Sequence, residues 1–328
     1  MMKRSLILLL AMVPVTIWAQ FAPASCFPGT TAMHADSSAF VAWATGCTVE
    51  RGPIRINKPN QGYASYGEDT LVKGKPGGTY DIVSLGDGGS ATVTFASPIF
   101  NGEGPDFAVF ENGLHPDTDT TMTLYFLEIA FVEVSSDGEN FFRFPAITNV
   151  PFETQLGGFA DMNPEQIHNF AGKYEAFYGT PFDLDEVEDN ALLDKNKVTH
   201  VRIIDVIGNI NPEYATYDSE GHPVNDPWPT PFESCGFDLD AVGVIHDLAH
   251  NAVPDNESEM VSVYPNPAKD KLCVKGENIQ SVEIYNLVGQ QVMNSKNTTI
   301  ELNDLAEGVY FVRVVCESDT YTKRIVKQ

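Results

Sequence analysis

Basic residues are scarce in this sequence of 328 residues, in which 20 Lys and Arg stand against 45 Asp and Glu. The imbalance is local. Residues 20–259 carry 10 basic and 37 acidic side chains, whereas residues 260–328 carry 8 of each. A net charge of −27 over residues 20–259 repels nucleic acid and anionic lipid. The composition therefore excludes nucleic acid as a partner and favours cations, or simply solubility.

Long apolar runs are missing beyond the N-terminus. No later segment is apolar over the roughly 18 residues that a membrane-spanning helix needs. At the N-terminus, Lys3 and Arg4 precede an apolar run over residues 6–13, and the small residue Ala19 follows. This pattern is typical of a secretory signal peptide. We therefore expect residues 1–19 to direct export and the mature protein to be soluble, without a transmembrane span.

Motifs of common catalytic sites are also missing. The chain has no G-x-S-x-G, no H-E-x-x-H and no phosphate-binding glycine loop. Glycosidases need only two carboxylates. Glu128 and Glu133 lie five residues apart on one expected strand and would face opposite sides, but Glu128 could pair with Glu111 or Asp205. A polysaccharide-active hydrolase or lyase therefore stays open as an alternative.

Cysteines number only five, and none has the Cys/His spacing of a zinc site. An exported protein can oxidise its cysteines. Cys26–Cys47 and Cys273–Cys316 are plausible disulfides, because each pair lies within one segment of the chain. Cys235 would then be left over.

Short runs of β-branched and aromatic residues, separated by turn clusters, dominate the rest of the sequence. The expected strands are residues 91–95, 106–112, 126–135, 141–144, 200–207 and 237–245. The Asp-Gly in residues 136–139 predicts a tight hairpin. One short helix is expected over residues 163–174, with Asn163 as its cap and Pro164 in the first turn. Many short strands with little helix favour an all-β fold, an antiparallel sandwich.

The stretch "GFDLDAVGVI", residues 236–245, raises a question of its own. It is typical of a buried strand, yet it contains Asp238 and Asp240. Side chains alternate along a strand, so both carboxylates should share a face with Val242 and Val244. Unpaired carboxylates in an apolar layer are costly. These two acids are therefore expected to have a specific partner.

The segment "GGSATVTFASPIFNGEGPDFAVFEN", followed by "VEVSSDGENFFRF" and the closing "GFDLDAVGVI", resembles a discoidin or galactose-binding-like jelly roll over about residues 80–246. It is also similar to an uncharacterised group of bacterial cell-surface proteins. The resemblance implies an antiparallel jelly-roll β-sandwich as the body of the protein. Residues 145–197 are a long insertion relative to a minimal jelly roll.

This resemblance also implies a structural calcium ion, which galactose-binding-like domains often hold beside one end of the sandwich. Calcium takes six to eight oxygen ligands. The expected ligands here are Asp238, Asp240, Asp106 and Glu111. The alternative is that Asp238 and Asp240 cap backbone amides or pair with Arg202 or Arg143.

A long polar loop over residues 208–234 is the candidate ligand-binding segment, because loops of this length are usually functional or disordered. Trp228 stands among three prolines, and Tyr214 and Tyr217 belong to the same loop. A stiff, exposed indole would stack on a sugar; alternatively, Trp228 plugs the end of the sandwich. We expect a non-catalytic protein that recognises a carbohydrate or another small exogenous ligand. Capture of a corrinoid or haem for an outer-membrane importer, and a structural adhesin, are the alternatives.

The last 68 residues closely resemble the C-terminal sorting domain of the type IX secretion system. The matching residues include Tyr264, Pro265, Asn266, Pro267, Gly289, Gly308 and Lys323. The resemblance implies that the type IX machinery is a partner, and that the protein is secreted or displayed on the surface of a Gram-negative bacterium. The expected organisation is a signal peptide (1–19), a β-sandwich body (20–249), a linker (250–260) and a small sandwich-like sorting domain (261–328).

Overall fold

The computed structural model describes residues 21–116, 119–251, 261–276, 278–287, 289–317 and 320–328. The chain divides into two compact units, residues 1–251 and 252–328. The signal peptide expected at residues 1–19 and most of the expected linker lie outside the described residues. Within the described part of the chain, no helix is both long and apolar enough to cross a membrane.

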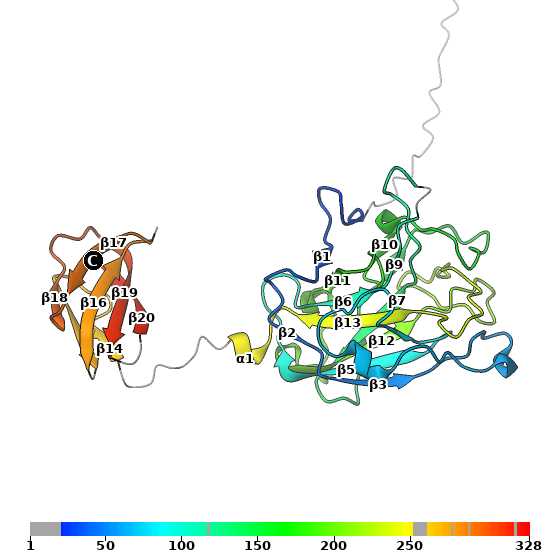
Figure 1. Ribbon diagram of the computed structural model, residues 1–328, viewed down its shortest axis with the longest axis horizontal. Helices are drawn as coiled ribbons and strands as arrows, with labels where there is room; N and C mark the ends of the chain where they lie inside the picture. The colour runs from blue at the N-terminus through cyan, green and yellow to red at the C-terminus, as the bar shows by residue number, and fades with distance from the viewer. Residues whose placement is uncertain (1–20, 117–118, 252–260, 277, 288, 318–319) are drawn as a thin grey trace, which may run out of the picture. The chain divides into compact units, whose positions relative to one another are not determined.

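Two antiparallel sheets form the frame of the N-terminal unit (Figure 1). The strands of the first are β1 (Met33–His34), β2 (Ala42–Trp43), β4 (Val83–Ser84), β6 (Phe107–Glu111), β11 (Tyr178–Phe182) and β13 (Asp238–Val244). Those of the second are β3 (Gly46–Glu50), β5 (Ser90–Ile99), β7 (Ala130–Ser135), β8 (Phe142–Arg143) and β12 (Val198–Asp205). Their orders are β1-β11-β6-β13-β2, with β4 beside β13, and β3-β5-β12-β7-β8. The expected all-β sandwich is confirmed, while its jelly-roll identity stays a prediction.

Alternating side chains explain why these runs form strands. In the second sheet Val201 and Ile203 of β12 lie opposite Val134 and Val132 of β7, and all four side chains are buried in the core between the sheets. Each fully buried aliphatic side chain of this kind contributes about 1.5–3 kcal/mol. A second core lies outside this pair of sheets, around Tyr125 and a small sheet of β9 (Ile147–Thr148) and β10 (Ile167–His168).

In the described part of the chain, helical structure is limited to short turns. These are η1 (Pro59–Gln61), η2 (Asp69–Val72), η3 (Pro164–Gln166), η4 (Leu184–Glu186), η5 (Lys195–Lys197) and α1 (Leu248–Asn251). Asn163 caps η3 as expected, since its side chain accepts the Glu165 N–H at 3.0 Å. The expected helix over residues 163–174 is nevertheless wrong beyond η3. Ile167 enters β10 and is buried in the second core, so strand pairing ends the helix after one turn.

Strand β13 contains an irregularity that changes the face of the sheet on which Asp238 lies relative to Val242. Its pairing with β6 shifts between Leu239 and Ala241, so Asp240 is an extra residue. A bulge of this kind reverses the alternation of side chains beyond it. Leu239 and Val242 consequently both pack into the core between the sheets. The expectation that Asp238 shares a face with Val242 is wrong for this reason.

The expected disulfides are not present, because Cys26, Cys47, Cys235 and Cys273 all carry free thiols. Cys47 packs against the core between the sheets. The Cys26 sulfur instead lies 3.9 Å from the Tyr125 hydroxyl, in the second core. The two partners of the first expected bridge thus lie apart, since Cys47 is half-buried against the core between the sheets whereas Cys26 is exposed.

The C-terminal unit is a small sandwich with its own core. Its strands are β14 (Val261–Tyr264), β15 (Lys271–Gly276), β16 (Ile279–Tyr285), β17 (Gln291–Ser295), β18 (Thr299–Glu301), β19 (Gly308–Cys316) and β20 (Thr320–Lys327). They form sheets of order β14-β15-β18 and β17-β16-β19-β20. Asn266 ties the start of the unit to its end, donating to the Arg324 carbonyl at 3.0 Å and accepting the Val326 N–H at 2.9 Å.

Candidate functional site

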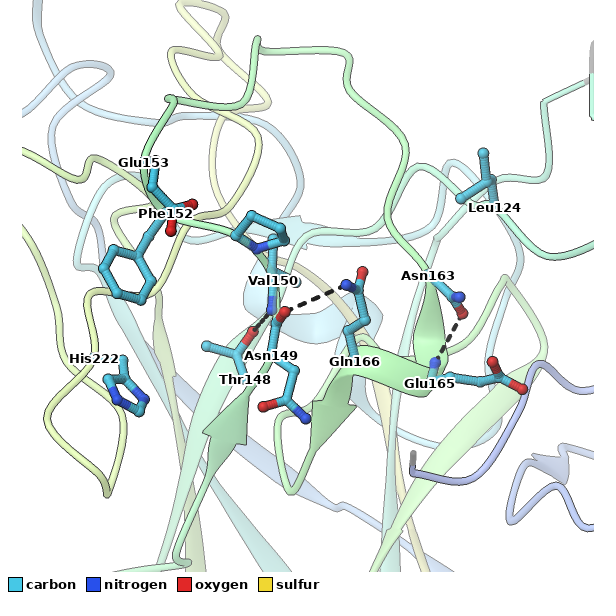
Figure 2. Close-up of a pocket in the computed structure, with 11 residues that line it drawn as sticks. Leu124, Thr148, Asn149, Val150, Phe152, Glu153, Asn163, Glu165, Gln166 and His222 are labelled. Carbon is cyan, nitrogen blue, oxygen red and sulfur yellow. Dashed lines mark hydrogen bonds between the residues drawn. The ribbon is translucent and has the colours of Figure 1, made fainter. Parts of the chain in front are cut away.

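A cavity of about 740 Å³ opens beside β9 and β10 in the N-terminal unit (Figure 2). Eleven residues line it: Leu124, Thr148, Asn149, Val150, Pro151, Phe152, Glu153, Asn163, Glu165, Gln166 and His222. Phe152 and His222 lie together at one end, and Leu124, Asn163 and Glu165 lie at the other. The volume is within the range of small-molecule sites.

Aromatic rings line one end of the cavity, and polar groups line its middle. At that end, the rings of Phe152 and His222 stack with centroids 5.8 Å apart and an interplanar angle of 19°. Between the ends, the Gln166 amide donates to the Asn149 carbonyl at 3.3 Å. Neither Lys nor Arg lines the cavity. It therefore offers an aromatic surface together with amide and carboxylate groups, and no Lys or Arg to pair with an anion.

One wall of the cavity is held by a buried amide. The Asn225 side chain donates to the carbonyl oxygens of Pro151 and Thr154, at 2.6 and 2.8 Å, and accepts the Leu156 N–H at 3.0 Å. Asn225 is fully buried. Because three of its hydrogen bonds fix the segment that carries Phe152, this wall is formed before any ligand arrives.

His222 reaches the cavity from the long loop that the sequence singled out. Asp218, which is buried, accepts the backbone N–H of His222 at 2.9 Å and that of Thr148 at 3.2 Å. Ser219 also exchanges hydrogen bonds with Ala146, just before β9. This part of the loop is thus docked onto the cavity wall.

The aromatic residues expected to bind ligand lie elsewhere on that loop. Trp228 is only 8 % exposed, and its ring N–H donates to Asp87 at 3.0 Å while Arg55 lies over the ring. It is an internal anchor, the second of the two alternatives. Tyr214 is half-buried and Tyr217 is 46 % exposed, and neither lines the cavity.

The four expected calcium ligands do not come together. Asp106 precedes β6 and Glu111 ends it, about 17 Å away at the usual rise of a strand. The Asp106 carboxylate accepts the N–H groups of Gly102 and Leu184 at 2.7 and 2.8 Å. Among the described residues, no three His, Cys, Asp or Glu side chains are placed to hold one metal ion. The four residues do not fit a single ion here, and the calcium ion stays a prediction.

Asp238 and Asp240 have partners that are not metals. Asp238 accepts hydrogen bonds from the Ser84 hydroxyl and, at 3.2 Å, from the Asn112 amide. Asp240 accepts the Gly77 N–H at 2.9 Å, although its second oxygen is buried without a hydrogen-bond partner. Capping of a backbone amide therefore describes Asp240, whereas Asp238 accepts its hydrogen bonds from two side chains.

The expected arginine partners belong to another acid. Arg143 and Arg202 both form ion pairs with the Glu133 carboxylate, at 2.8 and 2.5 Å. Each guanidinium also lies over a phenylalanine ring, that of Phe131 for Arg143 and that of Phe141 for Arg202. This arrangement leaves neither arginine for Asp238 or Asp240. The ion-pair alternative for those two acids is therefore wrong.

A group of buried acids surrounds Asp238. Burial raises the pKa of Asp238 to about 7. Burial, reinforced by the Asp238 charge, also raises the pKa values of Glu111 and Glu128 well above their usual range. One oxygen of Glu111 is buried without a hydrogen-bond partner. Glu128 with Glu111 or Asp205 are the pairs considered for a hydrolase, but Glu128 is 4 % exposed and the other two are 1 % exposed, so a substrate has no access to them.

The mature protein is expected to lose stability as the pH rises from about 4 to about 7. The folded state keeps protons on these acids at pH values where the unfolded chain has released them. The contribution to the free energy of unfolding is therefore complete below the pKa of the unfolded state, and it is lost as the pH rises to the pKa of the folded state. For Asp238 the shift from 3.8 to about 7 corresponds to roughly 4 kcal/mol at most. Denaturant unfolding at pH 5 and pH 8 measures the difference. Asp238→Asn, which is neutral at both, should reduce it, and an unchanged difference would contradict the prediction.

Comparison with known proteins identifies the C-terminal unit. Residues 262–328 match the model of the secretion system C-terminal sorting domain. The expected sorting tail is confirmed. It indicates export by the type IX secretion system, contact with the type IX machinery, and a secreted or cell-surface protein. The motif of Tyr264 to Pro267 begins at the last residue of β14 and continues directly beyond it.

The comparisons that reach beyond the sorting domain show little similarity. No curated protein matches the chain. A Faecalibacterium prausnitzii beta-glucuronidase is 13% identical, with 73% of this chain and 37% of that chain covered and a TM-score of 0.18. A biofilm associated protein, BSP domain, is 13% identical, with 89% and 53% covered and a TM-score of 0.17. The chain thus spans from about a third to about half of these structures. TM-scores at this level do not indicate a shared fold.

Sequence reasoning missed the cavity itself. Phe152, Asn163 and Gln166 lie in the insertion over residues 145–197, which departs from a minimal jelly roll. That insertion was a usable signal, since a long addition to a compact sandwich is often functional. The insertion contacts the loop of His222 only through tertiary packing, so the sequence alone does not indicate that the two form one cavity.

Proposed function

We propose that this is a secreted or cell-surface binding protein, delivered by its sorting tail, whose N-terminal unit holds a carbohydrate or another small exogenous ligand in the cavity. The observation that carries the proposal is the preformed wall: Asn225 fixes the segment bearing Phe152 from inside the protein. A cavity whose walls are fixed in advance costs little ordering on binding. An exported protein meets such ligands outside the cell.

The lining favours a neutral, hydroxyl-rich ligand. Asn149, Asn163 and Gln166 supply amide groups, while Glu153 and Glu165 supply acceptors for hydroxyl donors. The Phe152 ring offers an apolar face of the kind that the C–H side of a sugar ring covers. With no Lys or Arg in the lining and a strongly acidic body, phosphorylated and carboxylated ligands are disfavoured.

Phe152→Ala is expected to weaken ligand binding about tenfold, because it removes the aromatic surface and leaves the buried core intact. Affinity electrophoresis of the mature protein in gels containing xyloglucan, galactomannan, arabinan or soluble starch measures retention. Tyr80→Ala is the matched control, since Tyr80 is 80 % exposed and does not line the cavity. Equal retention of the Phe152→Ala and Tyr80→Ala variants would place the site elsewhere, and no retention in any gel would oppose a glycan ligand.

One observation favours the alternative function, capture of haem as a nutrient. His222 lines the cavity, and imidazole is a common axial ligand of haem iron. Titration with haemin would then produce a Soret shift that His222→Ala abolishes. Absence of the shift in the wild-type protein would remove haem from consideration.

A further inference from the structure

Apolar side chains continue from one end of the cavity across the surface of the N-terminal unit. Leu124, at that end in Figure 2, begins an extended segment in which Tyr125 pairs with Met162 and Phe126 pairs with Leu114. Side chains alternate along such a segment, so Leu124 and Phe126 lie on one face while Tyr125 is buried on the other. Leu114, directly opposite Phe126, belongs to the same exposed face.

Two further phenylalanines extend this face. The ring centroids of Phe126 and Phe159 are 6.2 Å apart, and those of Phe159 and Phe232 are 5.7 Å apart. Phe159 is 75 % exposed and Phe232 is 47 % exposed. We name Leu114, Phe126, Phe159 and Phe232 the apolar ridge. Apolar side chains that gather on the surface in this way, beside a cavity, mark a binding surface.

Backbone packing holds the ridge in place. A side chain at Gly158 would come within 2.1 Å of the Pro229 carbonyl oxygen, so the segment bearing Phe159 lies directly against the loop bearing Phe232. Trp228, in the same loop, donates its backbone N–H to Leu156 at 3.4 Å. Because Trp228 is anchored in the interior, the backbone segments that carry Phe159 and Phe232 are held together before a ligand binds, which reduces the ordering that binding requires.

We propose that the cavity and the apolar ridge together bind a chain of neutral sugar units, with one unit in the cavity and the following units on the rings. This inference rests on the proposed function. The centroids of successive rings are separated by about the length of one pyranose unit, and neighbouring rings are tilted by 38° and 39° to one another. Neither the cavity nor the ridge contains Lys or Arg. A chain ligand gains affinity with length, since each added unit binds intramolecularly.

The test uses the mature protein and the polysaccharide that retards it most in affinity gels, together with oligomers of increasing length from that polymer. Isothermal titration should show affinity rising with length. Phe159→Ala should weaken binding of the longest oligomers about tenfold and leave the shortest ones unchanged. Phe152→Ala should weaken both. Leu192→Ala is the control, because Leu192 is also exposed but belongs to neither the cavity nor the ridge.

Each other outcome has a distinct meaning. Affinity that does not depend on length, or a Phe159→Ala variant that binds long oligomers like the wild type, overturns the chain inference and leaves the proposed function standing. Retention by none of the polysaccharides overturns the chain inference together with the carbohydrate ligand of the proposed function. A dimer on size exclusion that Phe159→Ala converts to a monomer, with glycan binding unchanged, would identify the ridge as a contact between copies of the protein and also overturn the inference.

Discussion

Removal of residues 262–328 is expected to leave the N-terminal unit in the periplasm of a host that has the type IX secretion system. The match to the sorting domain covers these residues and no others. The N-terminal unit has cores of its own, and every described residue of these cores belongs to that unit. The truncated protein should therefore fold and yet fail to cross the outer membrane. Fractionation into periplasm, cell surface and medium, with immunodetection, measures the distribution.

The control for this truncation is the folding of the remaining protein. A cooperative thermal transition of the truncated protein, close to that of the N-terminal unit in the full chain, would show that retention is not caused by misfolding. Truncated protein on the surface or in the medium at the level of the full chain would show that export does not need the C-terminal unit.

Trp228→Ala is expected to destabilise the protein by about 3–5 kcal/mol, the usual cost of removing a large buried aromatic side chain. Trp228 is buried, and its loss also removes a hydrogen bond to Asp87, a buried carboxylate that would keep only the Ile56 N–H at 2.7 Å. Losing a partner of a buried acid adds to the cost of the cavity. Equilibrium unfolding in urea measures the change.

Tyr217→Ala serves as the matched control, because Tyr217 belongs to the same loop but is 46 % exposed. Its removal should change stability by less than about 0.5 kcal/mol. If Trp228→Ala instead left stability nearly unchanged and abolished retention in polysaccharide gels, Trp228 would be a binding surface and the anchor assignment would be wrong.

Local sequence patterns predicted the strands and the sorting tail, because both depend on short-range features. Alternation and turn residues located β7, β12 and β13, and the motif around Tyr264 to Pro267 located the C-terminal unit. Asn163 was correctly expected as a cap because its partner, Glu165, is two residues away. Features of this range are visible in one sequence.

Features that depend on distant partners were not predictable. The bulge at Asp240 follows from how β13 meets β6, strands that lie more than a hundred residues apart. Trp228 is internal because Asp87 receives its N–H, and no local pattern connects the two. Proline-rich surroundings were compatible with both an exposed and an anchored indole. Phe232, four residues later in the same segment, is the aromatic side chain that reaches the surface.

One measurement bears most directly on the proposal of an exported glycan-binding protein. Protein recovered from the surface and medium of a host with the type IX system is run in gels of the neutral polysaccharides, as wild type and as Phe152→Ala. The wild-type protein should be present outside the cell and retarded in at least one gel, and the variant should be exported equally but retarded much less, as about tenfold weaker binding requires. Exported wild-type protein that no polysaccharide retards, or a variant retarded as strongly as the wild type, would contradict it.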